Sequence, residues 1–401
     1  MRVSPRLLLR LAAVEIVLVA VGLAAFRYTQ PLPEFTTAPA LPATVQTAAP
    51  PGVLPWPAQG QAALAISGLG MVGSSGGDAS PRPIASTAKL MTALVVVERH
   101  TLAAGASGPS IAISAADVDA YRAALRQDES SLPVQEGVPL TELQLLQGLL
   151  LPSANNYADI LARWDSGSVS AFVATMNDRA QELGMKQTHF DDASGFSAKT
   201  VSTAPDLLAL AQTVMDNPVL AGIVKQAQVT LPVAGLVHTT NALLGDQGVV
   251  GLKTGNTDEA GGCFVFAATT GPGDRPVTVL GVVLGQADLP AAFRASSALL
   301  SAVPAWLTTT AVVAKGDVVG AYAAASGGTS RLVAGGEIAL AGWAGDQIQL
   351  EVQLDQRKAP LAAGTKVGKL TATTRGQRVT VDILAADAIA SPGPWWRLWR
   401  H

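Results

Sequence analysis

The chain has 401 residues, of which 49% are hydrophobic and 14% are charged, and its formal net charge is −3. At about 150 residues per domain the length suggests two or three domains, and a charge near zero without a basic stripe argues against a nucleic-acid partner. The single cysteine, Cys263, excludes a framework of intramolecular disulfides, and we expect it to be a small buried hydrophobic residue.

The N-terminus has the pattern of an export signal. Three arginines within the first ten residues precede an apolar stretch from Leu11 to Phe26, which only Glu15 interrupts. Such a pattern places the body of the chain outside the cytoplasm. Because no obvious small-residue cleavage site follows, we expect residues 1–27 to be a retained signal-anchor in the cell membrane. A cleaved signal peptide stays open, since the apolar stretch is short for a span of ~20 residues.

Residues 28–58 and residues 392–401 lie outside the predicted domains. The first segment is rich in Pro, Ala and Thr, a composition typical of an extended, semi-rigid linker. The second holds three tryptophans and two arginines within ten residues. Tryptophan and arginine together suit the headgroup layer of a lipid bilayer. This tail is therefore expected either to contact the outer face of the membrane or to dock on its own domain.

Residues 59–307 are predicted to form an α+β domain. Apolar residues at helical spacing predict a buried helix over 89–97. A capping box at Thr141–Gln144 predicts that another helix begins there and ends near Leu150. Helices come first and an antiparallel sheet follows, which is the α+β pattern. The remaining predicted elements are helices at 156–164, 169–183 and 289–300 and strands at 248–253, 263–269 and 277–284.

Residues 308–391 consist of strand-sized alternating segments between glycine-rich turns, with no convincing helix. This pattern predicts a small all-β sandwich of roughly 80 residues. Its expected strands lie at 311–313, 331–333, 347–354, 366–373 and 378–384.

Three short strings in the middle of the chain carry the most information about function. They are Ser86-Thr87-Ala88-Lys89, Ser153-Ala154-Asn155 and Lys253-Thr254-Gly255. Each string alone is more typical of an ordinary helix cap or turn. Together, and in this order, they are the S-x-x-K, S-x-N and K-T-G elements of enzymes with a serine nucleophile.

The first two strings predict an activated serine. A serine hydroxyl is a weak nucleophile at neutral pH and needs a base within about 3 Å. Ser86 and Lys89 are three positions apart, so a helical turn places both on one face. Burial of Lys89 near a second cation, Lys253, is expected to lower its pKa, so that the neutral amine accepts the proton from Ser86. Ser153 is expected to relay a proton to the leaving amine, and Asn155 to orient Lys89 and hold a substrate carbonyl.

The third string predicts a binding site for the substrate. Lys253 offers a positive charge, and Thr254 a hydroxyl donor, to a substrate carboxylate. Gly255 leaves room for a peptide to lie along the strand edge by β-addition. The backbone amides of Ser86 and Asn256 are expected to donate to the oxyanion of the transition state. The four histidines have no metal-site spacing, and no metal or other cofactor is predicted.

Longer segments around the three strings carry a family resemblance. They are residues 83–93, 149–156, 183–190 with Gly195, 251–257 with 260–261, and near the end 359–360 and 364–368. These segments resemble the low-molecular-mass penicillin-binding proteins, the serine-type D-Ala-D-Ala carboxypeptidases. The resemblance implies a β-lactamase-like transpeptidase fold followed by a β-sandwich domain. It also implies that Ser86 attacks the bond between the two D-alanines of a peptidoglycan stem pentapeptide, and that β-lactam antibiotics acylate the same serine.

Three alternatives share these motifs. A D,D-endopeptidase that cuts peptidoglycan cross-links uses the same residues, and the sequence does not separate it from a carboxypeptidase. A β-lactamase of the same superfamily needs a glutamate between the second and third strings for deacylation, and the one glutamate there, Glu182, lies in a predicted helix. A catalytically silent cell-wall-binding protein is disfavoured because all the motif residues are present.

Overall fold

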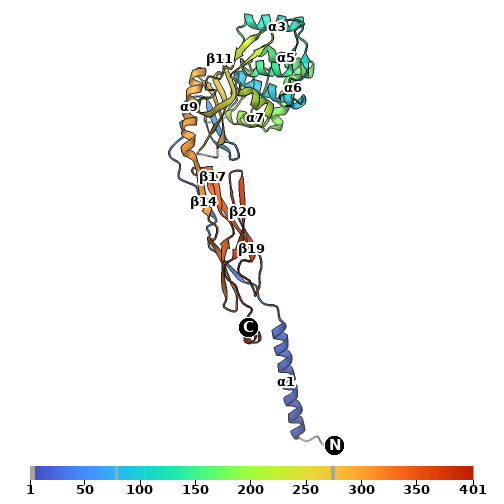
Figure 1. Cartoon of the computed structure of the whole chain (residues 1–401), viewed down its shortest axis with the longest axis vertical. Helices are drawn as coiled ribbons and strands as arrows, with labels where there is room; N and C mark the ends of the chain where they lie inside the picture. Colours follow the sequence, from blue (N-terminus) through green and yellow to red (C-terminus); the bar gives the residue numbers. More distant parts are fainter. Residues whose placement is uncertain (1–4, 77–79, 104, 272–275, 401) are drawn as a thin grey trace. The chain divides into compact units, whose positions relative to one another are not determined.

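The computed structural model describes residues 5–76, 80–103, 105–271 and 276–400, which form two compact units. The larger unit runs from Pro50 to Leu307, and the smaller unit combines the chain up to Ala49 with the chain from Thr308 onward (Figure 1). The larger unit is therefore one continuous segment, whereas the smaller unit is built from both ends of the chain.

An antiparallel sheet of five strands forms the centre of the larger unit, in the order β11 (Val249–Thr257), β12 (Gly261–Thr270), β13 (Val277–Gln286), β3 (Gln61–Ile66) and β4 (Gly70–Ser75). Helix α9 (Leu289–Trp306) packs on β12 and β13, and α7 (Ala204–Asp216) packs on β3 and β13 from the other side (Figure 1). Because helices cover both faces, the middle strands are buried along most of their length and read as nearly continuous apolar runs.

A cluster of helices lies on the α7 side of this sheet and surrounds one buried helix, α2 (Lys89–Arg99) (Figure 1). The cluster contains α3 (Ala115–Arg126), α4 (Glu142–Leu150), α5 (Asn155–Ser166), α6 (Val169–Glu182) and α8 (Pro218–Val224). Residues 89–97 of α2 are all buried, and the helix packs against α4, α5, α6 and α7. A 3-10 turn, η1 (Ala85–Ala88), leads into α2.

Short strand pairs and one further turn connect these helices. They are β5 (Arg82–Pro83) with β8 (Val201–Ser202), β6 (Ser110–Ile111) with β7 (Leu140–Thr141), β9 (Gln228–Leu231) with β10 (Gly235–His238), and the 3-10 turn η2 (Asp246–Gly248).

The α+β fold class predicted from the sequence is confirmed. The capping box at Thr141 does begin α4, with Gln144 as its partner. Helix α9 runs on to Trp306, past the end near 300 that the apolar pattern predicted, and includes Pro304 in its last turn. Helix α3 was not predicted: only Asp117 and Ala124 are buried along it, so it has almost no apolar face from which to recognise a helix.

The smaller unit contains a seven-stranded antiparallel sheet. Its strands follow the order β1 (Thr36–Pro39), β15 (Val318–Ala323), β16 (Thr329–Ala334), β20 (Gln377–Ala385), β19 (Lys366–Thr374), β18 (Gln347–Leu354) and β2 (Thr44–Gln46). A second pair, β14 (Leu307–Val313) with β17 (Ile338–Trp343), packs against it through β17. Side chains alternate between buried and exposed along β16 and β18, as a half-buried sheet requires.

The segment 28–58 is not the free linker that its composition predicted. Its strands β1 and β2 pair with β15 and β18, at opposite ends of the strand order. The five residue steps from Pro39 to Thr44 reach at most about 18 Å, whereas seven strands laid flat span about 29 Å. The sheet must therefore curl, so that one short segment can pair along both of its edges. The linker prediction was wrong for two reasons. β-Branched residues such as Thr36 and Val45 favour strands, and the edges of a sheet need a partner strand.

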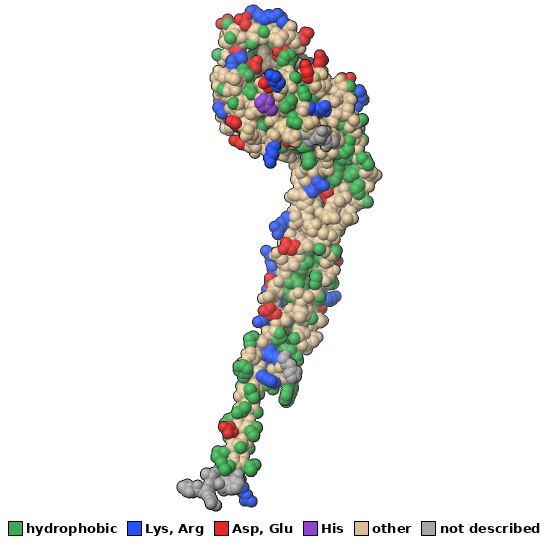
Figure 2. Space-filling model, turned by 180° about the vertical axis from the view of Figure 1, so that it is seen from behind, with side chains coloured by type: hydrophobic (Ala, Val, Ile, Leu, Met, Phe, Trp, Pro, Cys, Tyr) green, Lys and Arg blue, Asp and Glu red, His purple; other side chains and the backbone are tan. Residues whose placement is uncertain are grey.

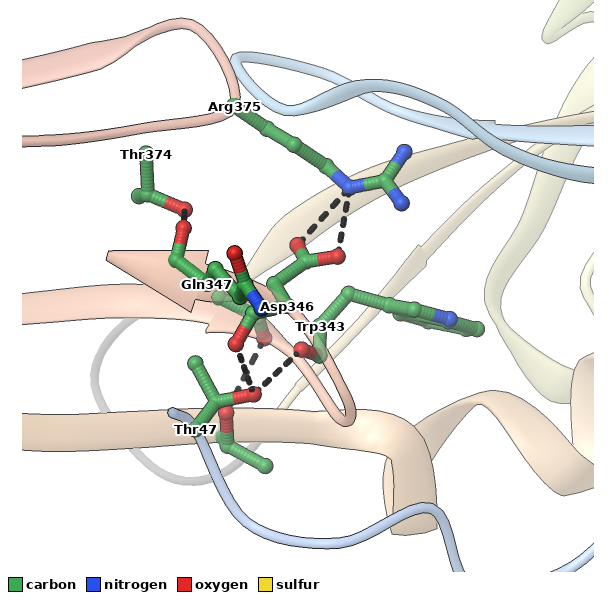
Figure 3. A network of polar contacts seen from close by, with 8 residues as sticks. Thr47, Trp343, Asp346, Gln347, Thr374 and Arg375 are labelled. Atoms are coloured by element: carbon green, nitrogen blue, oxygen red, sulfur yellow. Dashed lines mark hydrogen bonds and ion pairs between the residues drawn. The ribbon is translucent and has the colours of Figure 1, made fainter. Parts of the chain in front are cut away.

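Side-chain contacts secure this N-terminal strap, residues 36–47, to the sheet. The hydroxyl of Thr47 donates to the carbonyl oxygens of Trp343 at 2.9 Å and Asp346 at 3.1 Å (Figure 3). The Asp346 carboxylate in turn pairs with Arg375 at 2.7 Å. Phe35, just before β1, is buried with its ring 5.3 Å from that of Tyr322. The strap is thus an integral part of the smaller unit.

A long apolar helix, α1 (Pro5–Thr29), precedes the strap. Its segment Leu8–Thr29 has 22 residues with a mean hydropathy of 2.3, enough to cross a membrane. Figure 2 shows hydrophobic side chains along the face of α1 that is in view. The C-terminal tail forms a short helix, α10 (Pro394–Trp399), which contacts α1. Residues 1–4 and 401, the ends of these two predicted segments, lie outside the described residues.

Candidate active site

The amine of Lys89 lies at the centre of the site. Its Nζ is 2.7 Å from Ser86 Oγ, 2.6 Å from Asn155 Oδ1 and 2.8 Å from the carbonyl oxygen of Ser194. The Lys89 side chain is fully buried, while Ser86 is partly exposed. The sequence predicted that Ser86, Lys89 and Asn155 lie together, and the structure places them in direct contact from η1, α2 and α5. The Ser194 carbonyl is an addition that the sequence did not suggest.

The loop that supplies this carbonyl is held against Ser86 by close backbone packing. Asp192 accepts hydrogen bonds from the backbone amides of Ser194, Gly195 and Phe196 and from the hydroxyl of Thr200. Gly195 has a φ of 79°, and a Cβ there would lie 1.9 Å from the carbonyl oxygen of Ala85. Only glycine satisfies both conditions, so the backbone next to Ser86 depends on this residue.

The K-T-G string lies on β11 directly beside η1. A Cβ at Gly255 would lie 3.0 Å from the backbone nitrogen of Ser86, so this strand passes close to the serine amide. Lys253 is 1% exposed, and its Nζ donates to the carbonyl oxygen of Thr254 at 2.9 Å. The hydroxyl of Thr254 is 2.5 Å from that of Thr240, which lies before β11. The third string therefore forms a wall next to the serine.

A polar cleft of about 510 Å³ opens over these groups. Ser86, Asn155 and Asn256 line it, so the cleft gives solvent access to the serine. Phe196, which is 44% exposed, supplies its one large apolar side chain among the described residues. Four acidic residues from two loops form its mouth: Asp128, Glu129, Asp258 and Glu259.

Burial dominates the electrostatics of the two lysines. Burial lowers the pKa of Lys89 from its ordinary 10.5 to about 7, and the carboxylates of Asp192, Glu129 and Asp159 act in the opposite direction. The sequence predicted that burial near Lys253 lowers the pKa of Lys89; the effect of burial is confirmed, but Lys253 is not among the causes of the shift. Burial is the cause, and the repulsion acts on Lys253, whose pKa is held well below its usual range by burial and then by Lys89.

Other residues singled out from the sequence lie apart from this group of contacts. Ser153 is buried with a φ of 71°, and within the described part of the chain its side chain makes no hydrogen bond to Ser86, Lys89 or Lys253. Cys263 is buried on β12, and burial raises the pKa of its thiol to about 11. In the ranges that the structure describes, no three His, Cys, Asp or Glu side chains are grouped to hold a metal ion.

Three residues of the site were not found from the sequence. Asp192 shapes the Ser194 loop, Thr240 contacts Thr254, and Glu129 accepts a hydrogen bond from Asn155 at 2.7 Å. None lies in a catalytic string. The family resemblance covered residues 183–190 and Gly195, on either side of Asp192, but did not include Asp192 itself. Their roles depend on contacts between distant segments.

Comparison with known proteins agrees with this geometry. Residues 66–287, more than half of the chain, match the peptidase S11 family, described as D-alanyl-D-alanine carboxypeptidase. The chain belongs to this family. It is therefore a serine peptidase of the D-Ala-D-Ala carboxypeptidase class, as the motifs and the resemblance predicted.

Individual relatives support the assignment. The chain is 36% identical over 227 residues to a D-alanyl-D-alanine carboxypeptidase of Streptomyces sp. strain K15, which covers 52% of this chain and 75% of that protein. It is 32% identical over 193 residues to a D-alanyl-D-alanine endopeptidase of Haemophilus influenzae, covering 47% of this chain and 62% of that protein.

Solved structures agree with the fold. The Streptomyces K15 DD-transpeptidase matches with a TM-score of 0.55 at 28% identity, over 63% of this chain and 97% of that one. Penicillin-binding protein 5 of Haemophilus influenzae matches with a TM-score of 0.60 at 22% identity, over 85% of this chain and all of that one. The second match shares the fold and extends beyond the catalytic part.

Proposed function

We propose that this peptidase removes the terminal D-alanine from peptidoglycan stem pentapeptides through an acyl-enzyme on Ser86. The observation that carries the proposal is the position of the buried Lys89 amine, 2.7 Å from Ser86 Oγ beside an open cleft. With a pKa of about 7, a large share of Lys89 is neutral at physiological pH and available as a base. A serine in such surroundings is activated for attack on an amide carbonyl.

In the proposed reaction, Lys89 takes the proton of the Ser86 hydroxyl as Oγ attacks the carbonyl between the two D-alanines. The backbone amides of Ser86 and Asn256 stabilise the oxyanion. The C–N bond then breaks, and the proton that Lys89 took from Ser86 passes to the nitrogen of the leaving D-alanine. Because Lys89 Nζ contacts Ser86, Asn155 and Ser194 but not Ser153, the proposed relay through Ser153 requires a substrate group or a water between the two side chains. Water hydrolyses the ester on Ser86 and restores the enzyme. Asn155 keeps the amine in place through its Oδ1 contact.

The wall formed by β11 fits the binding role proposed for the K-T-G string. The hydroxyl of Thr254 reaches the substrate carboxylate with Lys253 behind it, and Thr240 orients that hydroxyl through their 2.5 Å contact. Gly255 keeps the strand free of a side chain where the substrate backbone lies next to Ser86. Penicillins carry a carboxylate and a reactive amide, so the same wall directs them to Ser86.

Labelling with a fluorescent penicillin tests the nucleophile. Wild type should be labelled covalently and Ser86→Ala should not. Ser170→Ala, which changes an exposed serine on α6, is the matched control and should label like wild type. Equal labelling of Ser86→Ala and wild type would refute the assignment of Ser86.

A second question is whether the substrate is a pentapeptide or a cross-linked peptide, because relatives with either activity match the chain. Proteins named as endopeptidases and as carboxypeptidases match at similar identity, 32% and 33%. Purified protein should therefore be incubated with a pentapeptide ending in D-Ala-D-Ala and with a cross-linked peptide dimer. The proposal expects free D-alanine from the first and no cleavage of the second, and cleavage of the dimer alone would favour the endopeptidase.

The proposal also places the enzyme at the outer face of the cytoplasmic membrane. Helix α1 supports an anchor by its length, and α10 makes contacts at the end of α1 that suit the headgroup layer. Arg400 donates to the backbone carbonyls of Gln30 and Pro31 at 2.7 and 3.1 Å. Trp395 and Trp399 remain 75% and 67% exposed, as expected for side chains that enter the interface.

Membrane fractionation at high salt tests this location. A chain that begins at residue 30 should be recovered mostly as soluble protein, and Trp395→Ser with Trp399→Ser should lower its residual binding to vesicles. If the full-length chain is expressed and the protein is recovered in the soluble fraction without its first residues, α1 is instead a cleaved signal.

A further inference from the structure

The loop between α3 and β7 is bound tightly to the start of α5. The backbone nitrogen of Asn155 donates to the carbonyl oxygen of Ser130 at 2.7 Å, and Asn155 Nδ2 donates to Glu129 Oε2 at 2.7 Å. The Asn156 side chain accepts from the backbone nitrogen of Leu132 at 3.0 Å and donates to its carbonyl at 2.8 Å. Four hydrogen bonds thus fix residues 129–132 against the S-x-N string.

Glu129 occupies a position that decides how the Asn155 amide is turned. A carboxylate accepts hydrogen bonds and donates none, so the NH₂ end of the amide must face Glu129. The oxygen end then faces Lys89, 2.6 Å from its Nζ. The reversed amide would set its oxygen against a carboxylate and its NH₂ group against an amine, so both contacts would be lost. A residue at 129 without an acceptor oxygen would not enforce this choice.

The charges around Lys89 differ in how they can be altered. Asp159 on α5, Asp192 on the loop before Gly195, and Lys253 on β11 also face this amine. Asp192 carries four or more hydrogen bonds that build its loop. Burial raises the pKa of Asp159 to about 6, so it carries less charge at mildly acidic pH. Glu129 has no ion pair within the described residues, lines the cleft, and can be neutralised without taking a loop apart.

We propose that Glu129 is a positioning residue of this peptidase, which orients the Asn155 amide toward Lys89 and places a negative charge near the Lys89 amine. The inference rests on the proposed role of Lys89 as the base that activates Ser86. Glu129 acts on the reaction through Asn155 and Lys89 and takes no part in the bond changes. Its location outside all three motif strings makes it a determinant of activity that motifs do not identify.

The test compares Glu129→Gln with Glu129→Ala by measuring the rate constant of acylation by a fluorescent penicillin between pH 5.5 and 9.5. Glutamine keeps an oxygen acceptor for Asn155 Nδ2 but removes the charge. Glu129→Gln should therefore keep the plateau rate within ~3-fold, while the midpoint of the acid limb moves down by about 0.5 to 1.5 pH units. The direction follows because losing a negative charge lowers the pKa of Lys89.

Alanine removes both the acceptor and the charge. Glu129→Ala should shift the midpoint in the same direction and also lower the plateau at least ~10-fold, because a catalytic group displaced by about 1 Å can cost up to ~100-fold. Glu136→Gln and Glu136→Ala, at an exposed position on the same loop, are the matched controls and should keep the wild-type profile. Thermal unfolding of each variant shows whether a loss of rate follows a loss of structure.

Two results would overturn the inference. One is a wild-type plateau and midpoint in both Glu129 variants. The other is an equal loss of rate in both with an unchanged midpoint, which would mean that Glu129 only supports the loop. Either result leaves the proposed function intact provided that wild type still labels on Ser86, whereas absence of labelling in wild type refutes the function itself.

Discussion

The buried amine of Lys89 makes a quantitative prediction about the effect of pH. Burial lowers its pKa from 10.5 to about 7, so the neutral, basic form should be about one tenth of the total at pH 6 and about nine tenths at pH 8. The rate constant for penicillin acylation should rise about 10-fold between these values, with its midpoint near pH 7. Stopped-flow or quenched labelling over that range measures the profile directly.

The same shift has a consequence for stability. In the unfolded chain Lys89 stays protonated up to its ordinary pKa of 10.5, whereas the folded chain releases the proton above about 7. Between these pH values the unfolded state binds more protons, so the free energy of unfolding rises with pH. From pH 7 to pH 9 this contribution amounts to about 2 kcal/mol, taking ~1.4 kcal/mol per pH unit and half-protonation at the lower limit.

Urea unfolding of wild type and Lys89→Met at pH 7, 8 and 9 measures this contribution together with the change that the loss of Lys89 makes in the titration of Lys253. From pH 7 to pH 9 the free energy of unfolding of wild type should increase by about 2 kcal/mol more than that of Lys89→Met. A constant difference, or an acylation midpoint above pH 9, would refute the argument that burial leaves Lys89 neutral near physiological pH.

Two further predictions concern backbone contacts. Gly255→Ala should reduce penicillin acylation at least ~10-fold, because its Cβ would lie 3.0 Å from the Ser86 nitrogen; Gly222→Ala, which has open space on α8, should leave acylation unchanged and stabilise by about 0.5–1 kcal/mol. A chain starting at residue 50 lacks β1, β2 and the buried Phe35. The free energy of unfolding of its smaller unit should fall by about 3 kcal/mol or more, and the open sheet edges should cause the chain to self-associate. A chain starting at residue 30 keeps these strands and should stay monomeric. Equal acylation by both glycine variants, or equal calorimetric transitions for both truncations, would contradict these expectations.

Local sequence signals were sufficient to predict those elements whose structure depends on residues within the same segment. The capping residues of Thr141–Gln144 and the apolar periodicity of residues 89–97 predicted α4 and α2 because both signals act within a few turns of chain. The three strings indicated which residues meet, since each has a restricted chemical role. Strands β11, β12 and β13 of the larger sheet were also predicted, whereas β3 and β4 were not. The middle strands β12 and β13 are covered on both faces and are therefore apolar along most of their length.

Features that depend on a distant partner could not be predicted in this way. The strap was interpreted as a linker because Pro, Ala and Thr dominate its composition, and its strands exist only by pairing with β15 and β18 more than 280 positions away. Thr240 and Glu129 carry no motif, and each gains a role only through contact with Thr254 or Asn155. The sequence predicted the groups that react but not those that hold them.

The charges around Lys89 show why residues outside the motif strings matter for the reaction. The motif strings require a buried lysine, and burial lowers the pKa of its amine. Three carboxylates, Glu129, Asp159 and Asp192, raise it again to about 7. None of them belongs to a motif, and two come from segments with no catalytic string. Two peptidases with identical strings but different residues at these positions should therefore work best at different pH values, so the working pH of such an enzyme is set by the surrounding loops and not by the motifs that identify it.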